Sequence, residues 1–130
     1  MKILVGYKGK GASKTALELA KDHVTAFGGE VFIVTSMEGG PGVPKRDFEH
    51  AEQELAKAAK GLSDENIDTE TALTVNGMTP GEDIVDFAKE KAIDEIIIGV
   101  KRRSKVGKLI FGSTAQYVIL NASCPVVTVR

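Results

Sequence analysis

The chain has few of the side chains on which metal sites and covalent catalysts depend. It contains one cysteine, two histidines and no tryptophan in 130 residues. Cys124 has no partner for an internal disulfide, and its place beside Pro125 in an apolar segment predicts a buried, unreactive thiol. His23 and His50 fall on predicted helices without metal-ligand spacing, so packing or solvent exposure explains each of them better than ligation. These residues offer no metal centre and no nucleophile paired with a base.

The chain also lacks an excess of either charge and a long hydrophobic run. Its 17 Lys and Arg residues are balanced by 18 Asp and Glu residues, so the net charge is −1. This balance argues against a general nucleic-acid binder and confines any basic function to a local patch. The apolar run at 1–6 is too short for a signal peptide or a membrane span. We therefore expect a cytoplasmic protein with no membrane contact, folded as a single domain over residues 1–130.

Hydrophobic periodicity alternates regularly between strand-like and helix-like segments. Gly28-Gly29 is expected to end the first helix, and Thr79 and Glu82 have the spacing of a capping box before the third. The strands are expected at 3–5, 31–34, 69–75, 95–99 and 125–129, and the helical stripes at 16–27, 48–62, 84–88 and 115–122. Five strands thus alternate with four helices.

Strands that are apolar on both faces and separated by helices indicate a parallel sheet covered on each side. The predicted fold is therefore α/β, a doubly wound five-stranded parallel sheet between four helices. In such sheets ligands bind beyond the carboxyl ends of the strands, where the strand order reverses. The loops after the first and fourth strands are the natural partners in such a site, although periodicity alone does not give the strand order.

The loop after the fourth strand carries the clearest indication of a ligand site. A buried strand ends at Gly99, a basic segment follows at 101–108, and a helix opens at Gly112-Ser113-Thr114. Glycine after a strand lets backbone approach a ligand, and a helix start offers unpaired N–H groups and hydroxyls to an anion. The segment therefore predicts a phosphate site. The alternative is an ordinary loop in which Ser113 only caps its helix.

The loop after the first strand resembles a Walker P-loop, but its lysine is at the wrong position for that motif. In that motif lysine follows the second glycine directly, whereas here Ala12 occupies that place after Gly11. Lys14 comes two residues later and is rotated by about 200° around the helix, so it should point elsewhere. The loop can still offer backbone N–H groups to phosphate as a nest.

The chain resembles the universal stress proteins of the small single-domain kind over essentially its full length. Gly99, Gly112 and Ser113 fit that family's pattern of a glycine after the fourth strand and a later Gly-Ser pair. The opening Ile-Leu-Val, the helix starting near Ser13 and the closing segment 124–130 also resemble the family. The resemblance implies an adenine-nucleotide alpha-hydrolase-like sheet in the order 3-2-1-4-5. It further implies ATP, with magnesium as its companion ion, between the first and fourth loops.

Three residues depart from the family's pattern. Lys8 stands where ATP-binding members carry an acidic residue, Ser36 lies where a valine packs on the base, and Arg102 replaces a glycine. Cations favour phosphate, and an Arg guanidinium can bind it bidentately. We therefore hypothesise anion affinity with relaxed or lost ATP selectivity. The candidate nucleotide- and phosphate-binding residues are Gly99, Gly112, Ser113, Thr114, Lys101, Arg102, Gly6, Lys8 and Ser36.

These observations favour a nucleotide- or phosphate-binding regulator of the stress-response type over a turnover enzyme, with slow ATP hydrolysis as the most activity expected. The alternative function is a nucleotide-independent dimeric adaptor that engages a protein partner not yet identified. The resemblance implies a homodimer paired through the last strand, and an apolar edge there would be protected by such pairing. That strand comprises Val126, Val127, Thr128 and Val129. A third interpretation, a nucleic-acid contact at 101–108, is weakened because no aromatic residues are interleaved there to stack on bases.

Overall fold

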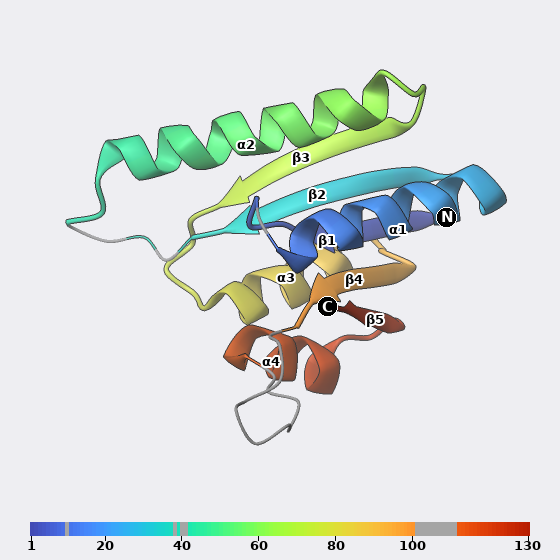
Figure 1. Cartoon of the computed structure of the whole chain (residues 1–130). Helices are drawn as coiled ribbons and strands as arrows, with labels where there is room; N and C mark the ends of the chain where they lie inside the picture. The colour runs from blue at the N-terminus through green and yellow to red at the C-terminus, as the bar shows by residue number, and fades with distance from the viewer. Residues whose placement is uncertain (10, 38, 40–41, 101–111) are drawn as a thin grey trace.

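The computed structural model describes residues 1–9, 11–37, 39, 42–100 and 112–130. Five strands alternate with four helices along this part of the chain (Figure 1). The elements are β1 (Lys2–Gly6), α1 (Ala12–Phe27), β2 (Glu30–Ser36), α2 (Lys45–Ser63), β3 (Asp68–Thr74), α3 (Pro80–Glu90), β4 (Glu95–Gly99), α4 (Ser113–Asn121) and β5 (Val126–Val129).

The five strands form one parallel sheet in the order β3-β2-β1-β4-β5. In the central ladders Val5 lies opposite Ile33 of β2 and Ile97 of β4. The chain first builds outward from β1 through β2 to β3 and then returns to the other side of β1 as β4. The strand order therefore reverses between β1 and β4, and the predicted fold class and strand order are confirmed.

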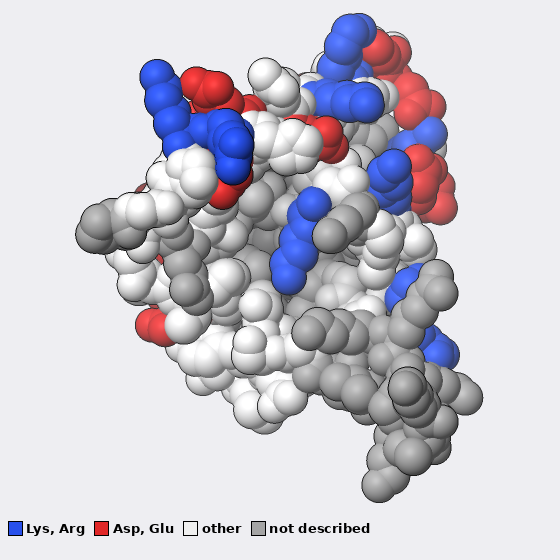
Figure 2. Space-filling model, turned by 60° about the vertical axis from the view of Figure 1, so that its left-hand side comes forward, with Lys and Arg blue, Asp and Glu red and all other residues white. Residues whose placement is uncertain are grey.

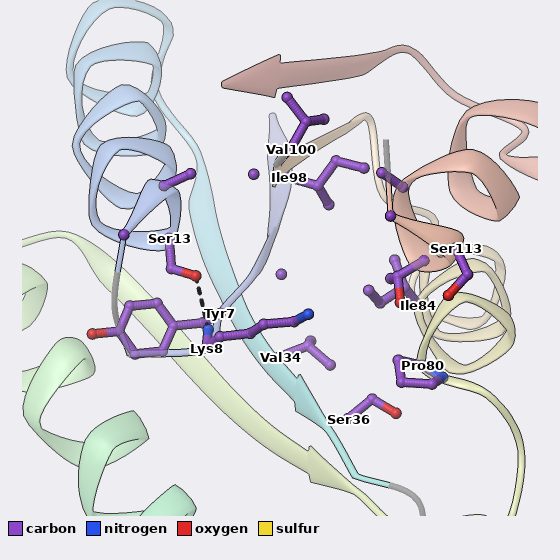
Figure 3. A pocket seen from close by; sticks show the side chains of 17 residues that line it. Tyr7, Lys8, Ser13, Val34, Ser36, Pro80, Ile84, Ile98, Val100 and Ser113 are labelled. Atoms are coloured by element: carbon purple, nitrogen blue, oxygen red, sulfur yellow. Dashed lines mark hydrogen bonds between the residues drawn. The ribbon is translucent and has the colours of Figure 1, made fainter. Parts of the chain in front are cut away.

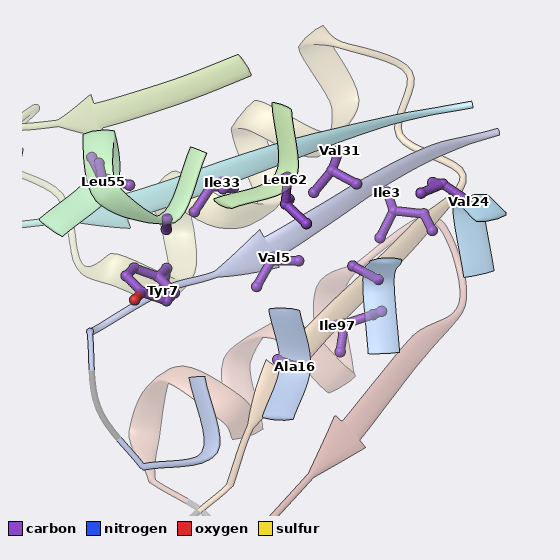
Figure 4. Packing of buried hydrophobic residues seen from close by; sticks show 12 residues of the cluster. Ile3, Val5, Tyr7, Ala16, Val24, Val31, Ile33, Leu55, Leu62 and Ile97 are labelled. Carbon is purple, nitrogen blue, oxygen red and sulfur yellow. The ribbon is translucent and has the colours of Figure 1, made fainter. Parts of the chain in front are cut away.

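Alternation along each strand sends side chains to two separate cores. On one face Ile3 and Val5 of β1 pack with Ile97 of β4 against α1 and α2 (Figure 4). On the other face Leu4 of β1 and Ile98 of β4 pack against α3 and α4. Because both faces of the central strands are buried, their sequences are almost continuously apolar.

The end of α1 and the start of α3 lie where the sequence predicts them. The Gly28 N–H donates to the Val24 carbonyl at the end of α1. Gly28 has a φ of 78°, a backbone angle that residues other than glycine rarely adopt. At the start of α3 the Thr79 hydroxyl oxygen accepts from the Glu82 N–H, and it donates to the Glu82 carboxylate over 2.9 Å. Thr79 therefore caps α3 as its spacing to Glu82 predicts, with the Glu82 carboxylate bound to the Thr79 hydroxyl in place of the backbone N–H of a full capping box.

A few boundaries differ from the sequence prediction. Helix α2 begins at Lys45, directly after Pro44, and so extends a turn before the apolar stripe. Helix α4 ends at Asn121, and Ile119, within the apolar stripe expected at 115–122, is 43% exposed. Only Ala115 and Val118 of that short helix are buried, because it contacts the rest of the fold along a narrow face. None of the helices described is long and apolar enough to cross a membrane.

Candidate functional site

A cavity of about 470 Å³ opens beyond the carboxyl ends of the strands, at the reversal between β1 and β4. Figure 2 shows this side of the molecule, with charged side chains gathered along its upper and right edges and one basic side chain across a central hollow whose surroundings are mostly uncharged. The cavity brings together residues from β1, β2, β4 and the start of α4. Seven of the sequence-predicted site residues line it: Gly6, Lys8, Ser36, Gly99, Gly112, Ser113 and Thr114. Their role in binding remains a prediction, and Lys101 and Arg102 lie outside the described residues.

The beginning of α4 supplies backbone donors to this cavity. Gly112 is the N-cap in an extended conformation, Ser113 is the first helical residue and Thr114 the second. The first N–H groups of a helix have no partner within it, and its dipole favours an anion at this end. Ser113 therefore does not act as the helix cap, in contrast to the alternative considered from the sequence.

The loop after β1 supplies a cation and a fixed backbone. The exposed side chain of Lys8 extends into the cavity (Figure 3). The Lys8 N–H donates to the hydroxyl of Ser13 over 2.9 Å, and Ser13 is buried in the first turn of α1. This hydrogen bond fastens the loop to the helix that follows it. Lys8 is consequently held where its ammonium group can face a phosphate.

Lys14, the residue that makes the first loop resemble a P-loop, lines a different cavity. This second cavity lies between α1 and α2 and includes Glu54 and Lys57. Tyr7 borders it, and burial raises the pKa of the Tyr7 phenol, with a further increase from the negative charge of Glu54. The P-loop interpretation is therefore wrong, because the rotation of α1 turns Lys14 away from the first cavity.

Close packing of backbone shapes the floor of the first cavity. A Cβ on Gly99 would lie 2.6 Å from the Cβ of Ala12, at the start of α1. Glycine is therefore required here by the approach of α1 to the end of β4. The walls are apolar, with Val34, Ile84 and Ile98 facing the cavity.

One buried carboxylate beside the cavity was not singled out from the sequence. Asp83 is 2% exposed in the first turns of α3, and its carboxylate accepts hydrogen bonds from Ser36, Thr74 and Asn76. Its place in the first turn of α3 also sets its charge favourably at a helix N-terminus. Its immediate neighbours Ile84 and Val85 are apolar, and this was the available signal that the position faces inward.

The histidines and the cysteine lie away from this site. His23 Nδ1 lies 2.6 Å from Glu95 Oε1, a half-buried pair that connects α1 to the start of β4. His50 is exposed on α2. Cys124 is half-buried instead of fully buried; burial raises the pKa of its thiol, and Asp94 and Glu95 raise it further. Within the described ranges, no three His, Cys, Asp or Glu side chains are grouped to hold a metal ion.

Comparison with known proteins identifies relatives whose sequences resemble this chain over nearly its full length. A sequence profile of the Universal stress protein family matches residues 1–130. The chain is 34% identical to the "Universal stress protein in QAH/OAS sulfhydrylase 3'region" of Thermus aquaticus, over 98% of this chain and 97% of that protein.

Two solved structures agree with this result. A universal stress protein from Archaeoglobus fulgidus is 36% identical with a TM-score of 0.86, covering 99% of this chain and 96% of that one. A universal stress protein from the same organism, solved in complex with dAMP, is 31% identical with a TM-score of 0.81, covering 99% and 95% respectively. The chain described here therefore belongs to the universal stress protein family.

Proposed function

We propose that this protein is a cytoplasmic regulator that binds ATP or another phosphate ligand in the cavity between the loops after β1 and β4. The observation that supports this proposal most strongly is that the N-terminus of α4 and the side chain of Lys8 meet in one cavity. Helix dipole, free N–H groups and an ammonium ion all favour an anion at the same place. Magnesium would accompany the polyphosphate as its counter-ion.

The remaining walls suit the rest of a nucleotide. A volume of about 470 Å³ is within the range of small-molecule sites, and the side chains of Val34, Ile84 and Ile98 offer apolar surface to a flat base. The related structure from Archaeoglobus fulgidus that contains dAMP supports a nucleotide as the ligand class.

A regulatory role fits this site better than rapid turnover. Asp83 is the buried carboxylate beside the cavity, and three side-chain donors already occupy it. A general base for ATP hydrolysis needs a free acceptor within reach of the attacking water. Slow hydrolysis is accordingly the most activity we expect.

The role of the α4 N-terminus can be tested at Ser113. Proline is favoured at the first helical position, and Gly112 already has the extended φ of −69° and ψ of 164° that a following proline requires. Ser113→Pro therefore removes one N–H group and one hydroxyl while keeping the helix. We expect ATP binding to weaken by about tenfold or more by calorimetry, because a single hydrogen bond to a charged group contributes about 1.5–3 kcal/mol.

Ser113→Ala is the matched control because it removes the hydroxyl alone, and we expect it to lose less affinity than Ser113→Pro. Circular dichroism should show the same helix content in all three proteins. Wild-type affinity in the proline variant would contradict a phosphate site at this helix end.

A second candidate function, a dimeric adaptor for a protein partner, is favoured by β5. Among the described residues this strand pairs with β4 alone, and it stands at the edge of the sheet. Val126, Val127 and Val129 are half-buried and Thr128 is exposed. Exposed edges of this kind invite pairing with another chain, so we propose a homodimer through β5.

Sedimentation equilibrium tests this arrangement. We expect a dimer at micromolar concentration and a shift toward monomer in Thr128→Lys, because an edge lysine opposes strand pairing. If that variant still binds ATP, nucleotide binding does not depend on dimer formation. A wild-type monomer at the same concentration would contradict the homodimer.

A further inference from the structure

The second cavity, between α1 and α2, has a volume of about 410 Å³, which is within the range of small-molecule sites. Its apolar floor consists of Leu17 from α1 together with Ala58 and Leu62 from α2, and all three pack in the core on this face of the sheet. Gly61 borders the same space and lies within α2, with no packing neighbour within 4 Å of the place where a Cβ would lie. Glycine is unfavourable in a helix, so its presence here costs stability and leaves the cavity open.

The end of the cavity farthest along both helices is closed by paired charges. Lys21 of α1 and Glu65 of α2 form an ion pair with an N–O distance of 2.7 Å. The hydrogen bond from Lys21 to Glu65 raises the pKa of Lys21, and the negative charges of Glu65 and Glu18 add to this effect. The charged groups at this end therefore already interact with one another.

The phenol of Tyr7 distinguishes the other end of the cavity. Tyr7 is only 7% exposed, yet its hydroxyl makes no hydrogen bond to any of the described residues. Figure 3 shows the phenol oxygen pointing away from the Lys8 side chain, on the side where α1 and α2 lie. Lys8 thus extends into the first cavity, whereas the hydroxyl of Tyr7 faces the second. The hydroxyl of a buried tyrosine usually has a partner, so this one is open to a ligand.

Three charged side chains of this cavity form no ion pair within the part of the chain that the structure describes. Lys14 of α1 and Lys57 of α2 supply two ammonium groups, and Glu54 of α2 supplies one carboxylate. Burial raises the pKa of the Tyr7 phenol, and the negative charge of nearby Glu54 raises it further. The phenol therefore keeps its proton at neutral pH and can donate it to a ligand.

A ligand that uses all of these groups carries both charges on a short frame. Its carboxylate would accept from the ammonium groups of Lys14 and Lys57 and from the Tyr7 hydroxyl, and its ammonium group would donate to Glu54. Because Glu54 lies close to the phenol, the opposite charges of the ligand must be adjacent. An α-amino acid has this arrangement, with both charged groups on one carbon.

We propose that the cavity between α1 and α2 binds a free α-amino acid with an apolar side chain. The charged end of the ligand would lie at Tyr7 and Glu54, and its side chain would lie on the apolar floor beside Gly61. The proposal does not depend on nucleotide binding, because the phenol, the unpaired charges and the floor all face the second cavity.

Ligand analogues test recognition of the two charges separately. L-Leucine is the probe, 4-methylpentanoate is the same molecule without the ammonium group, and L-leucinamide lacks the carboxylate. We expect the wild type to bind L-leucine at one site with a Kd below about 1 mM, and each analogue about tenfold or more weakly. NMR titration of the isotope-labelled protein measures these affinities, and the shifted amide signals should come from α1 and α2.

Three substitutions test the contribution of the protein. Tyr7→Phe removes the unpartnered hydroxyl and keeps the ring, so L-leucine should bind about tenfold or more weakly while urea unfolding shows no loss of stability. Glu54→Gln should weaken L-leucine binding and leave 4-methylpentanoate binding unchanged or stronger, because that analogue has no ammonium group. Gly61→Leu should abolish binding by filling the cavity, and α2 should remain folded because leucine favours a helix.

The chain offers a matched control for each polar change. Tyr117 lies on α4, and Glu52 is exposed on α2 outside the residues that line the cavity. Tyr117→Phe and Glu52→Gln should therefore keep the wild-type affinity for L-leucine.

Several results would overturn the proposal. Absence of saturable L-leucine binding to the wild type, or equal binding of L-leucine and both analogues, would show that this cavity does not recognise an α-amino acid. Unchanged L-leucine affinity in both Tyr7→Phe and Gly61→Leu, or shifted signals confined to the first cavity, would place the ligand elsewhere. None of these results bears on nucleotide binding, which titration with ATP tests separately.

Discussion

Replacing Gly99 by alanine is expected to lower the free energy of unfolding by about 1–3 kcal/mol, the usual range for overpacking. The added Cβ would lie 2.6 Å from the Cβ of Ala12 and 3.4 Å from its carbonyl carbon. Neither methyl group can rotate away, so the start of α1 must shift from the end of β4. Because both residues line the ligand cavity, ATP affinity should fall as well. Urea unfolding and calorimetry measure the two effects.

The chain offers a control and a rescue for this change. Gly61 lies within α2 with nothing within 4 Å of a built Cβ, so Gly61→Ala should stabilise the protein by about 0.5–1 kcal/mol. Ala12→Gly in the Gly99→Ala background removes the opposing methyl group and should restore most of the lost stability. Equal effects of Gly99→Ala and Gly61→Ala would contradict the close approach of α1 to β4.

Ile97→Ala is expected to cost about 2–5 kcal/mol of unfolding free energy, as large-to-small changes do in well-packed cores. Ile97 is fully buried in β4 and lies opposite Val5 of β1 and Val127 of β5. Its side chain packs beneath α1 (Figure 4). Truncation would leave a cavity that neighbours on three elements cannot all close.

Ile119→Ala makes the same chemical change at a position that is 43% exposed on α4. We expect a change within about 0.5 kcal/mol in either direction, because little burial is lost and alanine favours the helix. Urea unfolding of both variants provides the measurement. A loss below about 1 kcal/mol for Ile97→Ala would contradict the packing assigned to β4.

The fold was largely predictable because local patterns and tertiary burial agree. The run Ile96-Ile97-Ile98 is apolar at every position because Ile97 faces one core and its two neighbours face the other. This pattern predicts a central parallel strand. The strand order depends on which crossovers are made, which periodicity does not encode, and it came from the resemblance to a known family.

The candidate site was predictable only in part. Gly99 and Gly112-Ser113 mark it through backbone features that are visible in the sequence. The role of Asp83 depends on Ser36, 47 residues earlier, and the His23–Glu95 pair spans 72 residues. Such partners are brought together by strand register and helix rotation, so neither residue type nor spacing reveals them.

The most direct test of the account is a calorimetric titration of the wild-type protein with ATP, with inorganic triphosphate as the control, at two salt concentrations. We predict that ATP binds more tightly than triphosphate, because the base gains contacts with the apolar walls and Ser36. Added salt should weaken triphosphate binding more steeply, since that interaction is almost wholly electrostatic. Absence of ATP binding, or equal affinity for ATP and triphosphate at both salt concentrations, would contradict a nucleotide site between β1 and β4.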